Sequence, residues 1–274
     1  MAKIHPTAIV SGDVQVDDSA EIGPWCIVEG AVTLGAGVRL INSVRIQGPV
    51  KIGQGTLLYP GAAIGYEPQD YKFTPGSKTA GVEVGEHCLI RENVTVHAAT
   101  KADVPTRVGS RVFMMANSHV GHDGRVEDGV NMMNGASIAG HSHIGPKAIL
   151  SGGIMVHQFA RIGRLAMMSA LSAVSNDVPP FCLVAARNRI SGVNVVGMRR
   201  AGYASREITE VRRAYREVLR AALMRSEVIE ELTKRGVDSP AVAEMAQFVR
   251  ESKRGVCASS QRRAALGAEM SEAE

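Results

Sequence analysis

An aliphatic residue or methionine at every sixth position is the feature that most constrains the fold of this chain. One uninterrupted series runs from Val108 to Val174, and another fills the N-terminus from Ile4 to Ile64. A period of six matches neither the 3.6 residues of an α-helix turn nor the heptad of a coiled coil. Because six is even, a strand with its two-residue alternation fits inside each unit, and a turn can close it. Hexapeptide repeats of this kind are typical of a parallel β-helix.

The residues between the repeated positions fit a narrow coil. Two residues before many of them, the side chain is small or β-branched, as at Ala20, Cys26 and Val32. Aromatic residues make up only 4% of the chain, which suits a core too thin for large rings. If three hexapeptides form one triangular coil, residues 18 positions apart stack at the strand spacing of about 4.8 Å. This stacking rule predicts which parts of the sequence are neighbours.

Two segments interrupt the repeat. Residues 66–82 carry Pro68, Pro75 and Gly76 among polar residues, a composition typical of a protruding loop. Residues 98–107 form the second interruption. The stacking rule places this second loop at one corner of the coil, which we expect to be shared by Val84, Val120, Ile138 and Val156.

The repeat ends at Pro180, and helical patterns follow. We therefore divide the chain into a β-helix over 1–180, a helical domain over 181–255 and a disordered tail over 256–274. A first helix is predicted from Ser205, with an apolar face formed by Ile208, Val211, Tyr215, Val218, Leu219 and Ala222. A second is predicted over 226–234, and a third opens with Ser239 as its N-cap and proline at the first helical position.

Composition and charge exclude several classes of protein. The formal net charge is +4, and the arginines that crowd the C-terminal part are not interleaved with aromatic residues, so we expect no nucleic-acid partner. No apolar run is long enough to span a membrane, and the repeat begins too early for a signal peptide. The four cysteines lack any Cys-x-x-Cys pair, which is typical of free thiols in a reducing compartment. We therefore expect a cytoplasmic protein without membrane insertion.

Histidines gather on the last coils of the predicted β-helix. By the stacking rule, one edge collects five of the eight histidines: His119, His122, His141, His143 and His157. Such a cluster can hold zinc, as in the gamma-class carbonic anhydrases, but the His-x4-His pair of that class is missing, so we expect no metal. The alternative is a general base, because histidine accepts protons near neutral pH. Asp123 could orient His122, and the N–H of Gly140 could donate to an oxyanion.

Five stretches resemble the UDP-N-acetylglucosamine acyltransferases that begin lipid A synthesis. They are NSHVGHDGRV (117–126), SIAGHSHIG (137–145), VHQF (156–159), DVPP (177–180) and GVNVVGMRRAGY (192–203). The resemblance covers roughly residues 1–255 and implies a homotrimer of left-handed parallel β-helices, an exception to the usual crossover handedness. It also implies transfer of an (R)-3-hydroxyacyl chain from acyl carrier protein to the 3-hydroxyl of UDP-N-acetylglucosamine, without a metal or organic cofactor.

The resemblance implies roles for individual residues. His122 matches the general base, Asp123 its polarising partner and Gly140 the backbone donor to the oxyanion. The positions implied to surround the sugar, the diphosphate and the acyl chain are His119, His141, His157 and Gln158. The loop residues implied to reach the nucleotide sugar of a neighbouring subunit are Asp70 and Lys72, and the implied nucleotide contacts are Asn194 and Arg200. We expect the acidic carrier protein to dock on the helical arginines and on Lys147, Arg161, Arg164, Arg187 and Arg189.

Three positions depart from the family's pattern. Val196 and Ala201 stand where well-known members carry an acidic and a basic residue near the nucleotide. Ala170 stands where glycine lines the far end of the acyl groove, so we expect a ruler that favours shorter acyl chains, formed with Met167 and Met168. The sequence leaves open the preferred chain length, an acceptor with a 3-amino group, and a non-catalytic trimeric scaffold that binds acyl carrier protein or nucleotide sugar.

Overall fold

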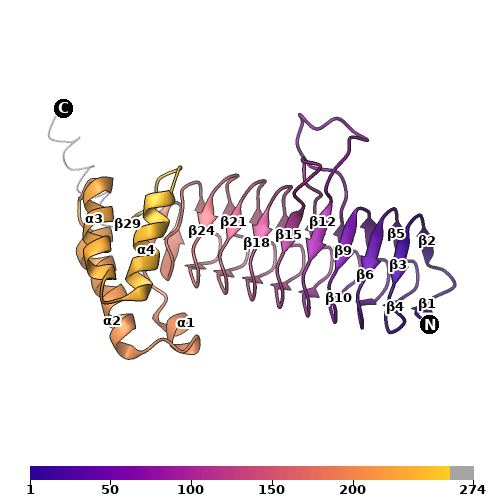
Figure 1. Cartoon of the computed structure of the whole chain (residues 1–274), viewed down its shortest axis with the longest axis horizontal. Helices are drawn as coiled ribbons and strands as arrows, with labels where there is room; N and C mark the ends of the chain where they lie inside the picture. The colour runs from indigo at the N-terminus through magenta and orange to yellow at the C-terminus, as the bar shows by residue number, and fades with distance from the viewer. Residues whose placement is uncertain (260–274) are drawn as a thin grey trace.

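The computed structural model describes residues 1–259 and shows a long parallel β-solenoid followed by helices (Figure 1). In the coils up to residue 174, consecutive strands enter different sheets, and strands of adjacent coils pair in parallel. Lys3 lies opposite Glu21 and Ile4 opposite Ile22, which is a register of 18 residues. The predicted fold class is therefore confirmed: hexapeptides build a three-sided parallel β-solenoid with helices at its C-terminal end.

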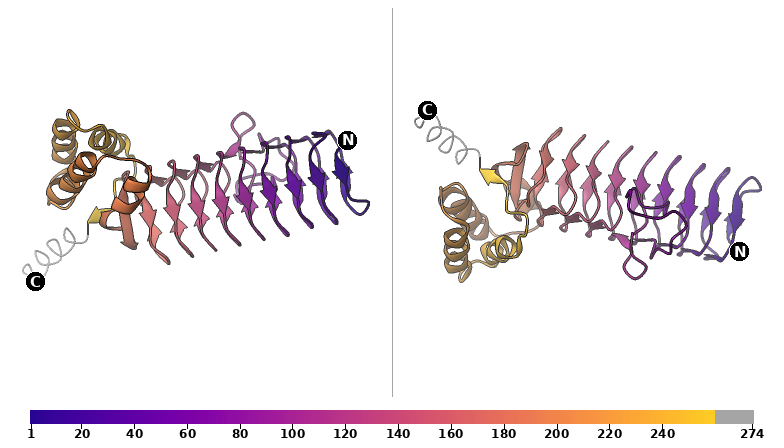
Figure 2. Two further views of the ribbon diagram at one scale, coloured as in Figure 1. Left: turned by 90° about the horizontal axis from the view of Figure 1, so that it is seen from below. Right: turned by 90° about the horizontal axis from the view of Figure 1, so that it is seen from above.

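Three sheets form the sides of the solenoid, as the views along its flanks show (Figure 2). The first contains β1 (Lys3–Ile4), β4 (Glu21–Ile22), β7 (Arg39–Leu40), β10 (Leu57–Leu58), β13 (Leu89–Ile90), β16 (Phe113–Met114), β19 (Asn131–Met132), β22 (Ile149–Leu150), β25 (Met167–Met168), β27 (Cys182–Ala186), β28 (Arg189–Val193) and β29 (Ala258–Ser259). The second contains β2 (Ile9–Ser11), β5 (Ile27–Glu29), β8 (Arg45–Gln47), β11 (Ala63–Ile64), β14 (Thr95–Val96), β17 (His119–Val120), β20 (Ser137–Ile138), β23 (Met155–Val156) and β26 (Ala173–Val174). The third contains β3 (Val14–Val16), β6 (Val32–Leu34), β9 (Val50–Ile52), β12 (Val82–Val84), β15 (Thr106–Val108), β18 (Arg125–Val126), β21 (His143–Ile144) and β24 (Arg161–Ile162).

The repeated apolar residues form the core of the solenoid. Leu58, Met114 and Ile138 are fully buried, and so are the smaller residues two positions earlier, such as Val112 before Met114 and Ala136 before Ile138. Burying one large aliphatic side chain contributes about 1.5–3 kcal/mol. Each hexapeptide therefore supplies its own share of the stabilisation, and the core continues from coil to coil.

Two loops leave the solenoid where the sequence predicts them, and the longer one projects far from the coils (Figure 1). The second loop follows β14, at the corner of Val120, Ile138 and Val156, as expected. The prediction that Val84 shares this corner is wrong, because Val84 pairs with Val108 in the third sheet. The second loop adds six residues, so Val96 lies opposite Val120 at a separation of 24 rather than 18. Six residues equal one side of the coil, so the insertion leaves the apolar period intact and hides the shift.

The C-terminal part begins later than predicted. Strands β27 and β28 extend the first sheet beyond residue 180 before the helices start. The helices are α1 (Val195–Arg200), α2 (Ser205–Ala214), the π-helical segment η1 (Tyr215–Leu219), α3 (Arg225–Gly236) and α4 (Pro240–Glu251). Ser239 caps α4 as predicted, accepting a hydrogen bond from the N–H of Val242. The buried face of α2 and η1 matches the prediction except at Ala222, which lies beyond η1 and is exposed.

The predicted disordered tail begins with ordered residues. Ala258 in β29 pairs with Arg189 in β28, and Val256 forms a bridge with Asp177. The tail prediction is therefore wrong for 256–259, and its remainder over 260–274 lies outside the described residues. Within the described part of the chain, no helix is long and apolar enough to cross a membrane.

Candidate active site

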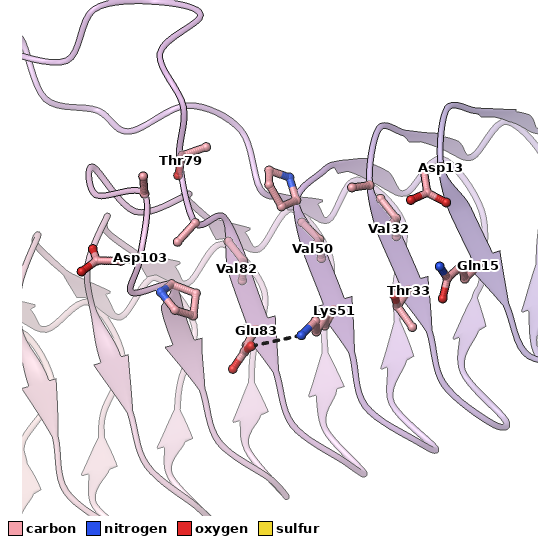
Figure 3. A pocket seen from close by; sticks show the side chains of 15 residues that line it. Asp13, Gln15, Val32, Thr33, Val50, Lys51, Thr79, Val82, Glu83 and Asp103 are labelled. Carbon is pink, nitrogen blue, oxygen red and sulfur yellow. Dashed lines mark ion pairs between the residues drawn. The ribbon is translucent and has the colours of Figure 1, made fainter.

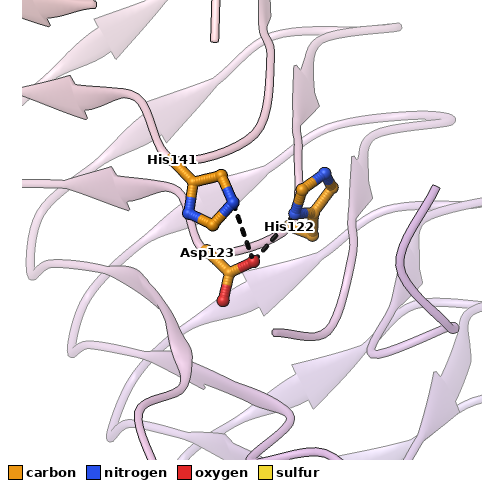
Figure 4. Close-up of side chains that lie close together, drawn as sticks. All are labelled: His122, Asp123 and His141. Atoms are coloured by element: carbon orange, nitrogen blue, oxygen red, sulfur yellow. Dashed lines mark hydrogen bonds and ion pairs between the residues drawn. The ribbon is translucent and has the colours of Figure 1, made fainter. Parts of the chain in front are cut away.

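Two adjacent coils bring together His122, Asp123 and His141 (Figure 4). His122 and Asp123 follow β17, and His141 follows β20, the next strand of the second sheet. The Nδ1 of His122 lies 2.8 Å from Oδ2 of Asp123, and the Nε2 of His141 lies 3.6 Å from the same oxygen. The side chains of His122 and Asp123 are only 11% and 10% exposed. The hydrogen bond between them is therefore largely shielded from water.

The charge on Asp123 fixes the tautomer of His122. Burial by itself raises the pKa of Asp123, but hydrogen bonds from His122 and Thr100 outweigh it and hold the pKa below its usual value. An ionised carboxylate can only accept hydrogen bonds. The Nδ1 of His122 must then carry the proton that it donates to Asp123. The Nε2 of His122 keeps a free lone pair, as a general base requires.

Gly140 lies directly against the reactive side of this imidazole. A Cβ atom added to Gly140 would lie 2.5 Å from Nε2 and Cε1 of His122. Within the described residues, the N–H of Gly140 donates no hydrogen bond. A proton acceptor and an unused backbone donor therefore stand side by side, which is the arrangement that attack on a carbonyl requires.

His119 belongs to the same cluster but is held neutral. Its Nδ1 lies 2.7 Å from the hydroxyl of Thr95, and its ring meets that of His97 edge to face at 5.3 Å. Burial, followed by the neighbouring His97 and His122, lowers the pKa of His119 to about 4. Sequence reasoning missed His97, because the six-residue insertion after it conceals that it stacks beside the later histidines.

His141 lies between the outer surface and the hydrogen-bonded pair of His122 and Asp123, which forms a dyad. Its ring stacks on Phe159 at 4.5 Å and meets the ring of His122 edge to face at 5.1 Å. Burial lowers the pKa of His141, while Asp123 and the more weakly acting Asp70 raise it. Asp70 of the first loop is therefore within electrostatic reach of this site in the same chain. Phe159 was not predicted, although an aromatic residue is rare enough in this chain to have been a signal.

Two predicted members of the histidine cluster lie apart from the dyad. His143 sits in β21 of the third sheet, where its Nε2 lies 3.0 Å from Glu127, so its predicted convergence with the others is wrong. His157 and Gln158 are exposed one coil beyond His141. The Nδ1 of His157 lies 3.1 Å from the carbonyl oxygen of Gln158. Among the described residues, the titratable side chains shown to contact His122 or to interact with it electrostatically are Asp123, His141, His97 and His119.

The two predicted nucleotide contacts line a separate cavity of about 780 Å³ between α1 and the first sheet. Its walls include Asn131, Met133, Lys147, Ile149, Met167, Asn194, Val196, Arg200 and Ala201. Asn194 is only 5% exposed, and it caps α1 by accepting a hydrogen bond from the N–H of Gly197. Its amide donates to the carbonyl oxygen of Leu165, so its polar atoms already have partners within the chain.

The predicted acyl-chain ruler is only partly exposed. Ala170 is exposed and Met167 is half-buried at the cavity wall. Met168 points into the solenoid core and is fully buried. The assignment of Met168 to an external acyl groove is therefore wrong, because alternate residues of a strand face opposite sides and Met168 occupies the repeated core position.

A second cavity, of about 390 Å³, lies beside the projecting loop and the third sheet (Figure 3). Its walls include Asp13, Thr79 and Asp103, and the Nζ of Lys51 lies 3.7 Å from the carboxylate of Glu83. None of the predicted site residues lines it. The candidate functional residues therefore remain those of the histidine cluster.

The ligand atoms of His122, Asp123 and His141 lie within 4.8 Å of one another, so a metal ion is a possible occupant by distance. The carboxylate oxygen that they share is, however, already engaged. It accepts hydrogen bonds from the hydroxyl of Thr100 and from Nδ1 of His122, each at 2.8 Å. This arrangement favours proton transfer over metal binding.

The lowered pKa of His119 predicts acid sensitivity of the fold. Between about pH 6.5 and 4 the unfolded chain binds a proton at this residue that the folded chain does not, so the free energy of unfolding falls as the pH falls. Allowing for partial exposure, we expect a loss on the order of 2 kcal/mol at pH 4. Urea unfolding at fixed protein concentration should show a flatter pH dependence for His119→Gln. The exposed His5→Gln is the control, and equal slopes for His119→Gln and wild type would contradict the prediction.

Comparisons with known proteins show the family of the chain. Residues 177–257 match the family model described as UDP N-acetylglucosamine O-acyltransferase, domain 2. The acyl-[acyl-carrier-protein]–UDP-N-acetylglucosamine O-acyltransferase of Thermodesulfovibrio yellowstonii is 38% identical over 259 residues, which cover 94% of this chain and 100% of the relative. That of Rhizobium johnstonii is 40% identical over 220 residues, which cover 79% of this chain and 80% of the relative.

Solved structures give the same result. The UDP-N-acetylglucosamine O-acyltransferase of Moraxella catarrhalis RH4 superposes with a TM-score of 0.88 at 38% identity, covering 93% of this chain and 99% of that one. The UDP-N-acetylglucosamine acyltransferase of Francisella novicida superposes with a TM-score of 0.91 at 31% identity, covering 95% and 96%. The chain therefore belongs to the acyl-[acyl-carrier-protein]–UDP-N-acetylglucosamine O-acyltransferase family.

Proposed function

We propose that the protein transfers an (R)-3-hydroxyacyl chain from acyl carrier protein to the 3-hydroxyl of UDP-N-acetylglucosamine, as the first step of lipid A biosynthesis. The proposal includes a homotrimer of left-handed β-helices. The names of its relatives give the two substrates, and the chain aligns with the whole length of one relative. The observation that carries the proposal is the buried hydrogen bond between His122 and Asp123 beside Gly140.

The chemistry follows from the positions of these three groups. The Nε2 of His122 takes the proton of the sugar 3-hydroxyl as its oxygen attacks the thioester carbonyl. Asp123 stabilises the imidazolium that forms, and the N–H of Gly140 donates to the developing oxyanion. When the tetrahedral intermediate collapses, the C–S bond breaks, and the carrier-protein thiolate leaves and takes the proton from His122 to become the free thiol. The thioester is already activated, so positioning, a base and an oxyanion donor suffice, and the proposal includes no metal or organic cofactor.

The remaining predicted residues are proposed to hold the substrates. His119, His141, His157 and Gln158 would surround the sugar, the diphosphate and the acyl chain. The cavity walled by Arg200 would receive the nucleotide, with the guanidinium as a partner for phosphate. Val196 and Ala201 make that wall more apolar than the acidic and basic residues that well-known family members carry at these positions would. Asp70 and Lys72 are proposed to reach the nucleotide sugar of a neighbouring subunit.

The helical arginines are proposed to receive the acidic carrier protein. Arg212, Arg216 and Arg220 line a shallow cavity of about 420 Å³ with Tyr215. Within the described residues, none of these three arginines forms an ion pair. Two of the other arginines expected to contact the carrier are already paired, Arg161 with Glu251 and Arg164 with Glu244. These three arginines, on α2, on η1 and directly after η1, therefore fit an acidic partner better than the paired ones.

Reversing one of these charges should weaken carrier-protein binding. We expect Arg216→Glu to raise the KM for acyl carrier protein about fivefold at low salt, because like charges then face each other. The KM for UDP-N-acetylglucosamine should stay the same, and the difference should shrink at 0.5 M salt as screening increases. The exposed Arg45→Glu on β8 is the control. A change that salt does not affect would argue against electrostatic docking.

The methyl group of Ala170 should limit the length of the acyl chain. We expect Ala170→Gly to shift the preferred donor to a longer chain. Removing the methyl group frees space for a further methylene of the acyl chain, and burying one methylene contributes about 0.8 kcal/mol. Competition between donors of different length measures the shift. Ala31→Gly, also at an exposed position, is the control. An unchanged preference would remove Ala170 from the ruler.

The experiment that tests the proposed function is acyl transfer from a panel of 3-hydroxyacyl carrier proteins. UDP-N-acetylglucosamine and its 3-amino analogue serve as acceptors, and the product is identified by mass spectrometry. Transfer to the first acceptor supports the proposal. Transfer only to the amino analogue would change the acceptor. Binding of either substrate without any transfer would instead indicate a non-catalytic scaffold.

A further inference from the structure

The second loop closes over the carboxylate of the dyad. The hydroxyl of Thr100 donates a hydrogen bond to Oδ2 of Asp123 at 2.8 Å. The backbone N–H of Thr100 lies 3.2 Å from Oδ1 and 3.3 Å from Oδ2 of the same side chain. The N–H of Asp123 in turn donates to the hydroxyl of Thr106 at 2.8 Å. Both ends of the loop therefore hold Asp123, which follows a strand of the next coil.

We infer that Thr100 is a positioning residue, which acts through Asp123 to keep His122 oriented for proton abstraction. The inference rests on the proposed function of the dyad. The χ2 angle of aspartate is a broad torsion, so an unrestrained carboxylate rotates readily. The two donors of Thr100 restrict that rotation and leave Oδ2 directed at Nδ1 of His122. When the Nδ1–H is held in this hydrogen bond, the orientation of the imidazole ring is set, and with it the direction in which Nε2 points.

Thr100 also competes with His122 for the same carboxylate oxygen. The oxygen Oδ2 accepts from both Thr100 and His122, so each donor weakens the demand on the other. Removing the hydroxyl leaves the carboxylate with a stronger hold on the imidazole, which then binds a second proton more readily. The other titratable groups around His122 are His97, His119 and His141, and Asp70 and Lys101 act on His141. Changing Thr100 removes none of these titratable groups.

The position of Thr100 depends on the first loop as well. The N–H of Ala80 donates to the carbonyl oxygen of Lys101 at 2.7 Å, and that of Ala99 donates to the carbonyl oxygen of Gly81 at 3.2 Å. The residues on both sides of Thr100 are thus tied to the loop that carries Asp70 and Lys72. The two interruptions of the repeat form one unit, and this unit reaches the dyad through Thr100.

The test compares Thr100→Val with Thr100→Ser. We expect Thr100→Val to lower kcat about tenfold, as loss of a hydrogen bond to a charged group does, with the KM for UDP-N-acetylglucosamine within about twofold of wild type. The acid limb of kcat/KM should move to higher pH by about half a unit. Thr100→Ser keeps the hydroxyl and should retain kcat within about threefold. Thr33→Val makes the same change at an exposed position on β6 and is the control.

A second readout does not depend on turnover. NMR titration of protein labelled at histidine ¹³Cε1, assigned with His122→Asn, should show His122 of Thr100→Val protonating at higher pH than in wild type. An inactive wild type would overturn the proposed function, while the titration would still test Thr100. Unchanged kcat, pH profile and titration in Thr100→Val would overturn the inference. A loss of kcat without a pH shift, and without recovery in Thr100→Ser, would also overturn it, because loop misfolding would then explain the loss.

Discussion

Replacing His122 with alanine is expected to lower kcat for acyl transfer about 1000-fold, within the range that general bases contribute. The imidazole of His122 lies directly against Gly140, keeps a free lone pair on Nε2 and is hydrogen-bonded to a carboxylate partner through Nδ1. The KM for UDP-N-acetylglucosamine should change little, because the base acts mainly in the transition state. Initial rates with one acyl carrier protein donor, measured over a range of acceptor concentrations, separate the two parameters.

The matched control is His143→Ala. This histidine follows His141 by two residues, but it lies on the third sheet beside Glu127. It should retain activity close to wild type. Comparable losses in the two variants would show that removing any histidine perturbs the coil. A His122→Ala enzyme within about tenfold of wild type would exclude His122 as the base.

The contrast between His141 and His143 shows what the sequence could predict. A period of six identifies the buried residue of each side, and the 18-residue register then gives its neighbours on the next coil. His141 lies in the turn between β20 and β21, whereas His143 is already the first residue of the next side. Proximity in the sequence across a corner therefore does not mean proximity in space, and this geometry was missing from the interpretation of the cluster.

The contribution of Thr100 could not be predicted from the repeat. Its loop has no apolar period, so nothing in the sequence fixes the path by which it returns to Asp123. The insertion also has the length of one side of the coil, which made Val84 seem to share a corner with Val120. In the C-terminal part, Asn194 before α1 was a readable N-cap signal, but Val195, Val196 and Gly197 are poor helix formers and concealed the short helix.

Replacing Gly140 with alanine is expected to lower kcat about 100- to 1000-fold, although the backbone N–H remains. The new Cβ would lie 2.5 Å from Nε2 of His122, closer than real Cβ contacts allow, so the ring must move away from the substrate. Gly140 does not have a left-handed φ angle, so alanine should not strain the backbone itself. The midpoint of urea unfolding should therefore stay close to that of wild type.

A double-mutant cycle isolates this effect. On the His122→Ala background there is no ring to displace, so adding Gly140→Ala should lower kcat by less than about threefold further. Gly152→Ala is the control for an added methyl, because its nearest neighbour, the carbonyl oxygen of Asn134, lies at an ordinary 3.5 Å. Losses that multiply in the double variant would mean that Gly140 acts independently of His122. Losses that overlap would mean that the absence of a side chain at Gly140 is what keeps Nε2 in place.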